Sequence, residues 1–156
     1  MRTFIFLVYS IMSLLYETVP AFEDTWIQYL GDVGRYRMAI ECEDSERKDW
    51  SHWTNVSRSS YSEAADKKST VGCLYHHSAI LPVEKPNALT SSNNFFFYCK
   101  SLMVKQPFEW GRHSIRILFQ SVLSNQSRSQ PVNVRFVTLH EIWFRHIDLE
   151  RFGGVI

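Results

Sequence analysis

Glycine is scarce in this sequence, with six glycines among 156 residues. None of them belongs to a glycine-rich loop of the kind that cradles a phosphate group. The Gly-x-Ser-x-Gly turn, which presents a nucleophilic serine, does not occur either. These absences argue against a nucleotide-binding loop and against the common serine-hydrolase arrangement.

Net charge is also nearly absent. The 17 Lys and Arg residues balance 16 Asp and Glu residues, which leaves a formal charge of +1. The densest charged stretch, residues 41–49, mixes both signs and is typical of a solvated loop. Because a nucleic-acid backbone rewards clustered Lys and Arg, we expect no nucleic-acid partner.

Long hydrophobic runs are lacking except at the start of the chain. Arg2 precedes an uncharged apolar run over residues 4–16, and Val19 and Ala21 are small residues at the positions that a signal peptidase reads. The run is too short for a bilayer core, which needs roughly 20 residues. We therefore predict a signal peptide over residues 1–21, a secreted domain over residues 22–156, and no membrane span.

Cysteine is the third scarcity. Only Cys42, Cys73 and Cys99 are present, and in an oxidising compartment two of them should pair. Sequence alone does not select the pair. We favour Cys73–Cys99, because both lie beside apolar runs, and this choice leaves Cys42 free or available for a disulfide-linked partner.

Two glycosylation sequons suit the same compartment. They begin at Asn55 and Asn125, each in a Ser-rich polar stretch where an acceptor loop would be exposed. The Trp-x-x-Trp pattern makes Trp50 a candidate for C-mannosylation, although two half-buried tryptophans at a strand edge would explain it equally well.

Apolar residues are plentiful, and most alternate with polar ones. Residues 35–41, 114–122 and 132–139 each follow this period of two, which favours half-buried strands. Residues 94–104 are apolar on both faces, as in a central strand covered twice. Polar turns separate the runs, and short helices are expected only over residues 62–68 and 146–152. The pattern predicts an all-β fold, a single β-sandwich or jelly-roll of about seven to nine strands.

Histidine raises the question of metal chemistry. In the stretch HEIWFRH, from His140 to His146, position i+4 from His140 is Phe144, so the zinc-protease motif His-Glu-x-x-His is not met. On a strand the two histidines would share one face with an apolar centre. His76 and His77 are adjacent, and on a strand they would point to opposite faces. We predict no metal and no cofactor.

The stretch over residues 36–54 resembles the end of a cytokine-receptor fibronectin-type domain. Trp50, Ser51 and Trp53 match the Trp-Ser-x-Trp-Ser box of that family, and Thr54 replaces its last serine. The resemblance implies that an arginine, Arg35 or Arg37, stacks on the tryptophan rings. The match covers a short part of the chain and lies too close to its start, so no receptor function is carried over from it.

These features together predict a secreted glycoprotein that binds an extracellular protein or glycan and does no catalysis. Trp and Tyr enrich binding hot spots. One alternative is a secreted hydrolase or glycan-processing enzyme that uses Glu109, beside an aromatic platform, and a histidine. A further alternative is a fragment or subunit of a fibronectin-type receptor ectodomain. The expected binding residues, placed in loops or at strand ends, are Trp50, Trp53, Tyr61 and Trp110.

Overall fold

The fold is helical. A computed structural model describes residues 2–42, 50–81, 88–124 and 132–145, and no strand occurs in these ranges. The all-β prediction, and with it the β-sandwich or jelly-roll, is wrong. The elements in chain order are α1 (Arg2–Thr18), the short 3-10 helix η1 (Pro20–Phe22), α2 (Glu23–Cys42), α3 (Trp50–Lys67), α4 (Gly72–Ile80), α5 (Ala88–Met103), α6 (Trp110–Ser124) and α7 (Val132–Arg145).

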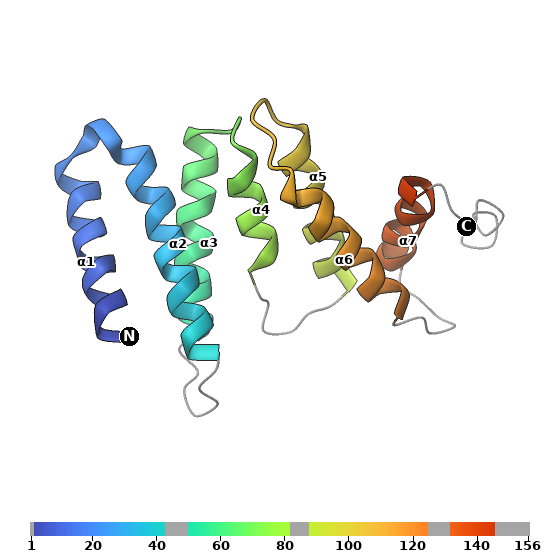
Figure 1. Cartoon of the computed structure of the whole chain (residues 1–156), viewed down its shortest axis with the longest axis horizontal. Helices are drawn as coiled ribbons and strands as arrows, with labels where there is room; N and C mark the ends of the chain where they lie inside the picture. The colour runs from blue at the N-terminus through green and yellow to red at the C-terminus, as the bar shows by residue number, and fades with distance from the viewer. Residues whose placement is uncertain (1, 43–49, 82–87, 125–131, 146–156) are drawn as a thin grey trace.

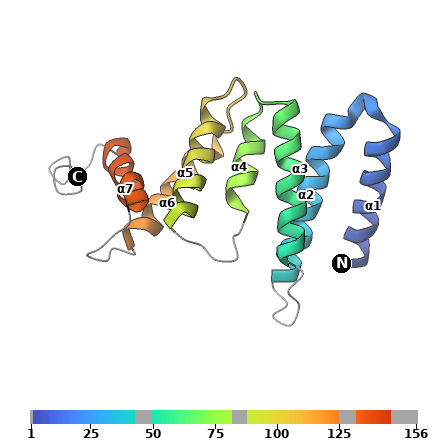
Figure 2. The same cartoon turned by 180° about the vertical axis from the view of Figure 1, so that it is seen from behind.

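The helices stand side by side in an array that follows the order of the chain (Figure 1). The most extensive packing is between α2 and α3. Helix α1 packs on α2, and α3 packs on α4. Beyond α4, helix α5 packs on α4, α6 and α7. The reverse view shows α1 and α7 at opposite ends, with α4 near the middle (Figure 2).

The apolar residues of α6 show why alternation of apolar and polar residues led to a wrong prediction of strands. Ile115, Ile117 and Phe119 were expected to share one strand face. Ile115 and Phe119 are buried, whereas Ile117 is 52% exposed. Positions i and i+4 lie on one helical face and i+2 lies away from it, so the same residues satisfy a helix with Leu118 packed beside them.

The two other misread stretches repeat this arrangement. In α7, Val137 and Thr138 are buried, as are Glu141 and Ile142 four residues further on, whereas Phe136 is exposed. In α5, the expected central strand, Phe95 and Tyr98 are buried three positions apart, and Phe96 faces outward. These spacings of three and four are helical.

Two hydrophobic cores lie on either side of α4. The N-terminal core consists of Ile27, Met38, Tyr61, Ala64, Leu74 and Leu81. The C-terminal core consists of Ala79, Phe95, Tyr98, Ile115, Phe119 and Val137. Because α4 supplies Leu74 to the first and Ala79 to the second, this one helix joins the two halves.

The start of α4 is held by backbone hydrogen bonds to the segment that precedes α6. Gly72 N–H donates to the Gln106 carbonyl and Gln106 N–H donates to the Thr70 carbonyl, each at 2.9 Å. A Cβ atom at Gly72 would lie 2.2 Å from the Ser101 carbonyl oxygen. Only glycine allows so close an approach of two backbones.

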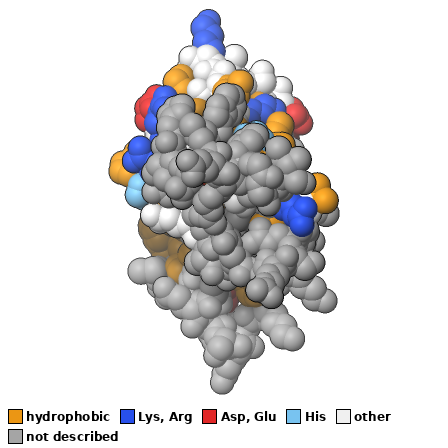
Figure 3. Space-filling model, turned by 90° about the vertical axis from the view of Figure 1, so that its right-hand side faces the viewer, with side chains coloured by type: hydrophobic (Ala, Val, Ile, Leu, Met, Phe, Trp, Pro, Cys, Tyr) orange, Lys and Arg blue, Asp and Glu red, His pale blue; other side chains and the backbone are white. Residues whose placement is uncertain are grey.

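The surface at the α7 end of the array mixes charges of both signs with hydrophobic side chains, where described residues are in view (Figure 3). Within the described residues, no single helix has both the length and the apolarity to cross a membrane. Only α1 and the segment after it reach that limit together, as a pair bent by 108°.

Candidate functional site

Adjacent histidines in the middle of the array bring polar groups from several helices together. The strand interpretation placed His76 and His77 on opposite faces, and this is wrong because both lie on α4, where successive residues are about 100° apart. Their ring centres are 5.9 Å apart, and the Phe108 ring contacts both. The site therefore has two neighbouring parts, one at each histidine.

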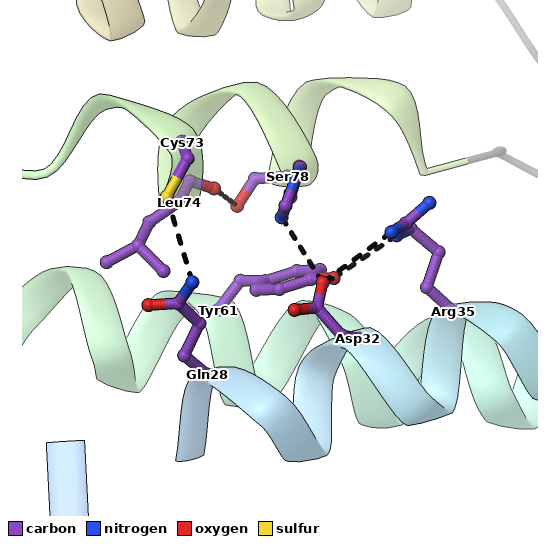
Figure 4. A network of polar contacts seen from close by, with 8 residues as sticks. Gln28, Asp32, Arg35, Tyr61, Cys73, Leu74 and Ser78 are labelled. Atoms are coloured by element: carbon purple, nitrogen blue, oxygen red, sulfur yellow. Dashed lines mark hydrogen bonds and ion pairs between the residues drawn. The ribbon is translucent and has the colours of Figure 1, made fainter. Parts of the chain in front are cut away.

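The part at His77 is a polar cluster between α2, α3 and α4 (Figure 4). The Tyr61 hydroxyl donates a hydrogen bond to Asp32 Oδ1 at 2.7 Å and accepts one from Arg35 Nε at 3.3 Å. His77 Nδ1 lies 3.3 Å from the same Asp32 oxygen, within ion-pair distance. The contact is an ion pair when the imidazole is protonated.

Burial and charge act in opposite directions at this cluster. Burial alone would raise the pKa of Asp32, but the contacts with His77, Tyr61 and Arg35 outweigh it and lower that pKa. Burial and the neighbouring carboxylate raise the pKa of Tyr61. Asp32 therefore stays ionised and Tyr61 stays protonated near neutral pH. The side chains of Asp32, Arg35 and His77 remain 18–24% exposed above the fully buried tyrosine.

Cys73 lies one turn before His77 on α4, and its thiol is held in the unreactive, protonated form. Gln28 Nε2 donates a weak hydrogen bond to its Sγ at 3.8 Å. Burial raises the pKa of the Cys73 thiol, and the Asp32 charge raises it further. A thiol held protonated is a poor nucleophile. Cys73 and Cys99 are both free thiols on α4 and α5, so the expected disulfide between them is not formed.

The part at His76 is a serine–histidine pair. His76 Nε2 and Ser114 Oγ of α6 are 2.8 Å apart. The histidine is 8% exposed, packs against the rings of Tyr98 and Phe108, and has no hydrogen-bond partner at Nδ1. Burial, followed by the charges of His77 and Arg35, lowers the pKa of His76 to about 4. At neutral pH this imidazole is uncharged and able to accept a proton from serine.

Metal binding has little support in the described ranges. There, no three His, Cys, Asp or Glu side chains gather closely enough to hold an ion. On α7, His140 Nδ1 donates to the Phe136 carbonyl at 2.8 Å, and its ring packs on Phe95 and Phe136. His146 lies outside the described residues.

The four expected binding residues are not brought together. Tyr61 is fully buried at the base of the polar cluster and cannot touch a partner in this conformation. Trp50 and Trp53 lie on α3, half-buried against the N-terminal core rather than in loops. Trp110 begins α6 and is 67% exposed, so it alone of the four is freely accessible.

The arginine–tryptophan contact implied by the receptor resemblance is present on a different scaffold. Arg37 Cζ lies 5.8 Å from the Trp53 ring centre, but the two residues are on α2 and α3, not on strands. The guanidinium also pairs with the buried Glu41 carboxylate at 2.6 Å. The Trp53 ring also makes an edge-on contact with Tyr9 from α1, with ring centres 5.4 Å apart. The helical fold excludes a fibronectin-type receptor domain.

The remaining sequence-based candidates lie apart from this site. Glu109 is exposed before α6 and pairs with Arg112 at 3.0 Å, so it forms a surface corner. Asn55 is exposed on α3, where its Oδ1 accepts a hydrogen bond from Arg58. Cys42 ends α2, and Asn125 lies outside the described residues.

Sequence reasoning missed Asp32 and Ser114. It named Arg35 only as a candidate partner for tryptophan, whereas Arg35 pairs with Asp32 and Tyr61. A helical interpretation of residues 23–42 would have placed Asp32 and Arg35 on one face, since they are three apart. Ser114 carries no signal of its own, because its pairing with His76 depends on how α4 and α6 pack.

The sequence matches no protein-family model, and no curated protein matches it either.

Proposed function

We propose that this chain is a secreted binding module whose partner is an extracellular protein. The observation that carries the proposal is the outward face of α1. Phe4, Leu7, Ile11 and Leu14 form a stripe along this helix, and each is at least 47% exposed. A helix at the end of a soluble array normally presents polar residues to solvent. An export signal, by contrast, needs a run that is apolar all round.

The cleavage position supports the same function. Ala21 lies in η1, between α1 and α2, and is exposed. A protease therefore has access to this bond without unfolding either helix. Cleavage after Ala21 would release α1 and leave a chain that begins at Phe22.

The architecture favours binding. Arrays in which each helix packs mainly on its chain neighbours expose long surfaces, and such surfaces are commonly used to hold protein partners. Trp110 lies exposed on this surface at the start of α6. Tryptophan supplies more binding energy at interfaces than most other residues do.

A second candidate function, a secreted hydrolase, is favoured by one observation, the His76–Ser114 pair. In such an enzyme Ser114 Oγ would attack an ester or amide carbonyl, and His76 would take the serine proton and return it to the leaving group. The pair has the distance that this step requires. It lacks the third group that orients the histidine in most enzymes of this kind, because Nδ1 has no partner.

Secretion and partner capture test the main proposal. Full-length chain expressed in cultured animal cells should appear in the medium beginning at Phe22, and intact mass before and after glycosidase treatment should show whether Asn55 and Asn125 carry glycans. Trp110→Ala should abolish capture of a cell-surface partner with unchanged melting temperature, whereas the control Ile117→Ala, at another exposed apolar residue of α6, should keep capture. Chain that remains inside the cell with residues 1–21 attached contradicts the proposal.

A fluorophosphonate probe tests the second candidate. Attack by Ser114 Oγ on its phosphorus would expel fluoride and leave a covalent phosphonate on the serine. Labelling that is lost in both Ser114→Ala and His76→Gln would favour the hydrolase. Labelling at neither residue, in protein that still melts cooperatively, would exclude it.

A further inference from the structure

Helix α1 reaches past its neighbour α2 to contact α3 at two points. The Tyr9 ring meets the Trp53 ring edge-on, with centroids 5.4 Å apart and planes at 82°. The Tyr16 hydroxyl donates a hydrogen bond to Glu63 Oε1 at 2.7 Å, and Lys67 Nζ lies 5.4 Å from the Tyr16 ring centre. Because α1 and α3 run in the same direction (Figure 1), Tyr9 meets the start of α3 at Trp53 and Tyr16 meets its later turns at Glu63.

The surface under α1 has the build of a binding site. We call it the α1-covered face, and it consists of Arg37 of α2 with Trp53, Glu63 and Lys67 of α3. Arg37 Cζ lies 5.8 Å from the Trp53 ring centre, and its pairing with Glu41 holds the guanidinium in place. Glu63 and Lys67 are one turn apart and 3.4 Å from each other. An aromatic platform lies at one end, and a charged hydrogen-bonding pair lies at the other.

The two faces of α1 differ in chemistry. The outward stripe of Phe4, Leu7, Ile11 and Leu14 is apolar and belongs to the apolar run that an export signal requires. The Ser10 hydroxyl beside it donates a hydrogen bond back to the Phe6 carbonyl. The inward face carries Tyr9 and Tyr16, and Ser13 forms a hydrogen bond with Tyr9. An export signal has no need of an aromatic ring placed on Trp53 or of a hydroxyl placed at Glu63. These two contacts belong to the α1-covered face, which accepts a helix with aromatic residues seven positions apart.

We propose that the α1-covered face is the docking site for an amphipathic helix of the partner protein, and that α1 occupies it until cleavage after Ala21 opens it. This inference rests on the proposed function, because it requires release of α1. The partner helix would lie where α1 lies, with an aromatic ring on Trp53 and a hydroxyl donor at Glu63. A second copy of the chain does not suit this site, since its own matching helix would be cleaved as well.

In the uncleaved chain the Trp53 ring is already in contact with other side chains. It meets the Tyr9 ring of α1 and the Arg37 guanidinium of α2. Loss of α1 removes Tyr9 and uncovers a tryptophan that the arginine already holds in place. A preformed aromatic platform of this kind favours affinity because little ordering remains to be done on binding.

The probe for the test is a labelled synthetic peptide that copies residues 2–18, with Phe4, Leu7, Ile11 and Leu14 replaced by Lys to keep it in solution. Titrated by fluorescence anisotropy into chain purified from the medium, it should bind saturably. The same peptide with Tyr9→Ala and Tyr16→Ala should bind about tenfold more weakly or worse.

Variants of the chain locate the site. Glu63→Ala should weaken peptide binding several-fold without disturbing the core, because Glu63 is a half-exposed helix residue. Asp66→Ala is the matched control, because Asp66 is an exposed acid on the same helix, and it should bind like the parent. Ala21→Arg should block cleavage, keep α1 in place and abolish peptide binding.

The outcomes separate the two proposals. In one outcome the chain is secreted and begins at Phe22, yet it fails to bind the peptide or binds the tyrosine-free peptide equally well. Either result overturns the docking site and leaves the proposed secretion unaffected. Chain that retains residues 1–21 overturns both the proposed export and the docking site. If Glu63→Ala and Asp66→Ala weaken binding to the same extent, the effect is one of charge alone and the proposed geometry is wrong.

Discussion

His76 and His77 are neighbours in the chain, with ring centres 5.9 Å apart, yet they serve opposite halves of the molecule. His77 faces Asp32 of α2, and His76 faces Ser114 of α6. Each half of the array is therefore tied to α4 by one imidazole as well as by its hydrophobic core. The state of protonation of these rings should affect the joint between the halves.

The first prediction concerns stability in acid. The pKa of His76 is lowered to about 4 in the folded chain, against about 6.5 when unfolded, so the unfolded state binds the proton more readily. The free energy of unfolding should therefore be constant above pH 6.5 and fall as the pH drops from 6.5 to 4. A shift of this size corresponds to a loss of at most about 3 kcal/mol. Urea denaturation at pH 7, 5.5 and 4.5 measures it.

Two variants identify the group responsible. His76→Gln should lose stability at pH 7 but show a flatter pH dependence between 6.5 and 4. His113→Gln, which alters an exposed histidine on α6, should keep the slope of the parent chain. A slope that persists in His76→Gln would assign the effect to another residue. Asp32 does not interfere, because its lowered pKa affects stability only below the pKa of an unfolded aspartate, near 4.

The second prediction concerns the hydroxyl of Tyr61. Tyr61→Phe keeps the buried ring but removes the donor to Asp32 and the acceptor for Arg35. Hydrogen bonds to charged groups contribute about 1.5–3 kcal/mol, so we expect a loss in this range. Tyr36→Phe, on the exposed side of α2, should change stability by less than about 0.5 kcal/mol. Equal losses in the two variants would mean that the cluster contributes nothing to stability.

The third prediction compares two glycines. An added methyl at Gly72 meets backbone atoms, with the Ser101 carbonyl oxygen at 2.2 Å and Phe108 N at 2.8 Å. At Gly34 it meets the Ser57 hydroxyl at 2.6 Å, which a side-chain rotation can relieve. Gly72→Ala should therefore lose about 1–3 kcal/mol or fail to fold, while Gly34→Ala should stay within about 1 kcal/mol of the parent. Thermal melts of the two variants test this ranking.

The fourth prediction separates the outward stripe of α1 from its packing. Leu7→Lys and Ile11→Lys change exposed positions, so the Tyr9–Trp53 contact should remain. Charges within the apolar run should nevertheless stop export, which depends on an uninterrupted apolar segment. Comparing the amounts of each variant in medium and in cell lysate measures the effect. Leu7→Ile, which keeps the run apolar, is the control and should be exported normally.

The sequence contains apolar residues at helical spacing, but some of the same residues also fit the alternating pattern of a strand. In residues 114–122, apolar residues at 115, 117 and 119 fit a strand, while those at 115, 118 and 119 fit a helix. Only the burial of Ile115 and Phe119, with Ile117 exposed, decides between them. Aromatic and β-branched residues favoured strands by intrinsic preference, and packing along a helical face overrode that preference.

The candidate site was predictable only in part. The sequence alone marked His76, His77 and the Trp50–Trp53 pair as candidate functional residues. The receptor resemblance also suggested an arginine partner for tryptophan. Their geometry was not, because the partners Asp32, Ser114 and Tyr9 come from helices distant in sequence. Because the segment around His76 and His77 was interpreted as a strand, the two side chains were placed on opposite faces. The His76–Ser114 contact was therefore not predicted.

The row-like order of the helices has a consequence for how the chain acquires its structure. Because α2 packs on α3 and α3 on α4, most contacts close short stretches of chain, and chains dominated by such local contacts fold rapidly. The α2–α3 hairpin can thus form as the polypeptide emerges, before the residues of α6 exist. The C-terminal core would then assemble on a preformed template, with the two imidazoles of α4 meeting their partners first on one side and later on the other.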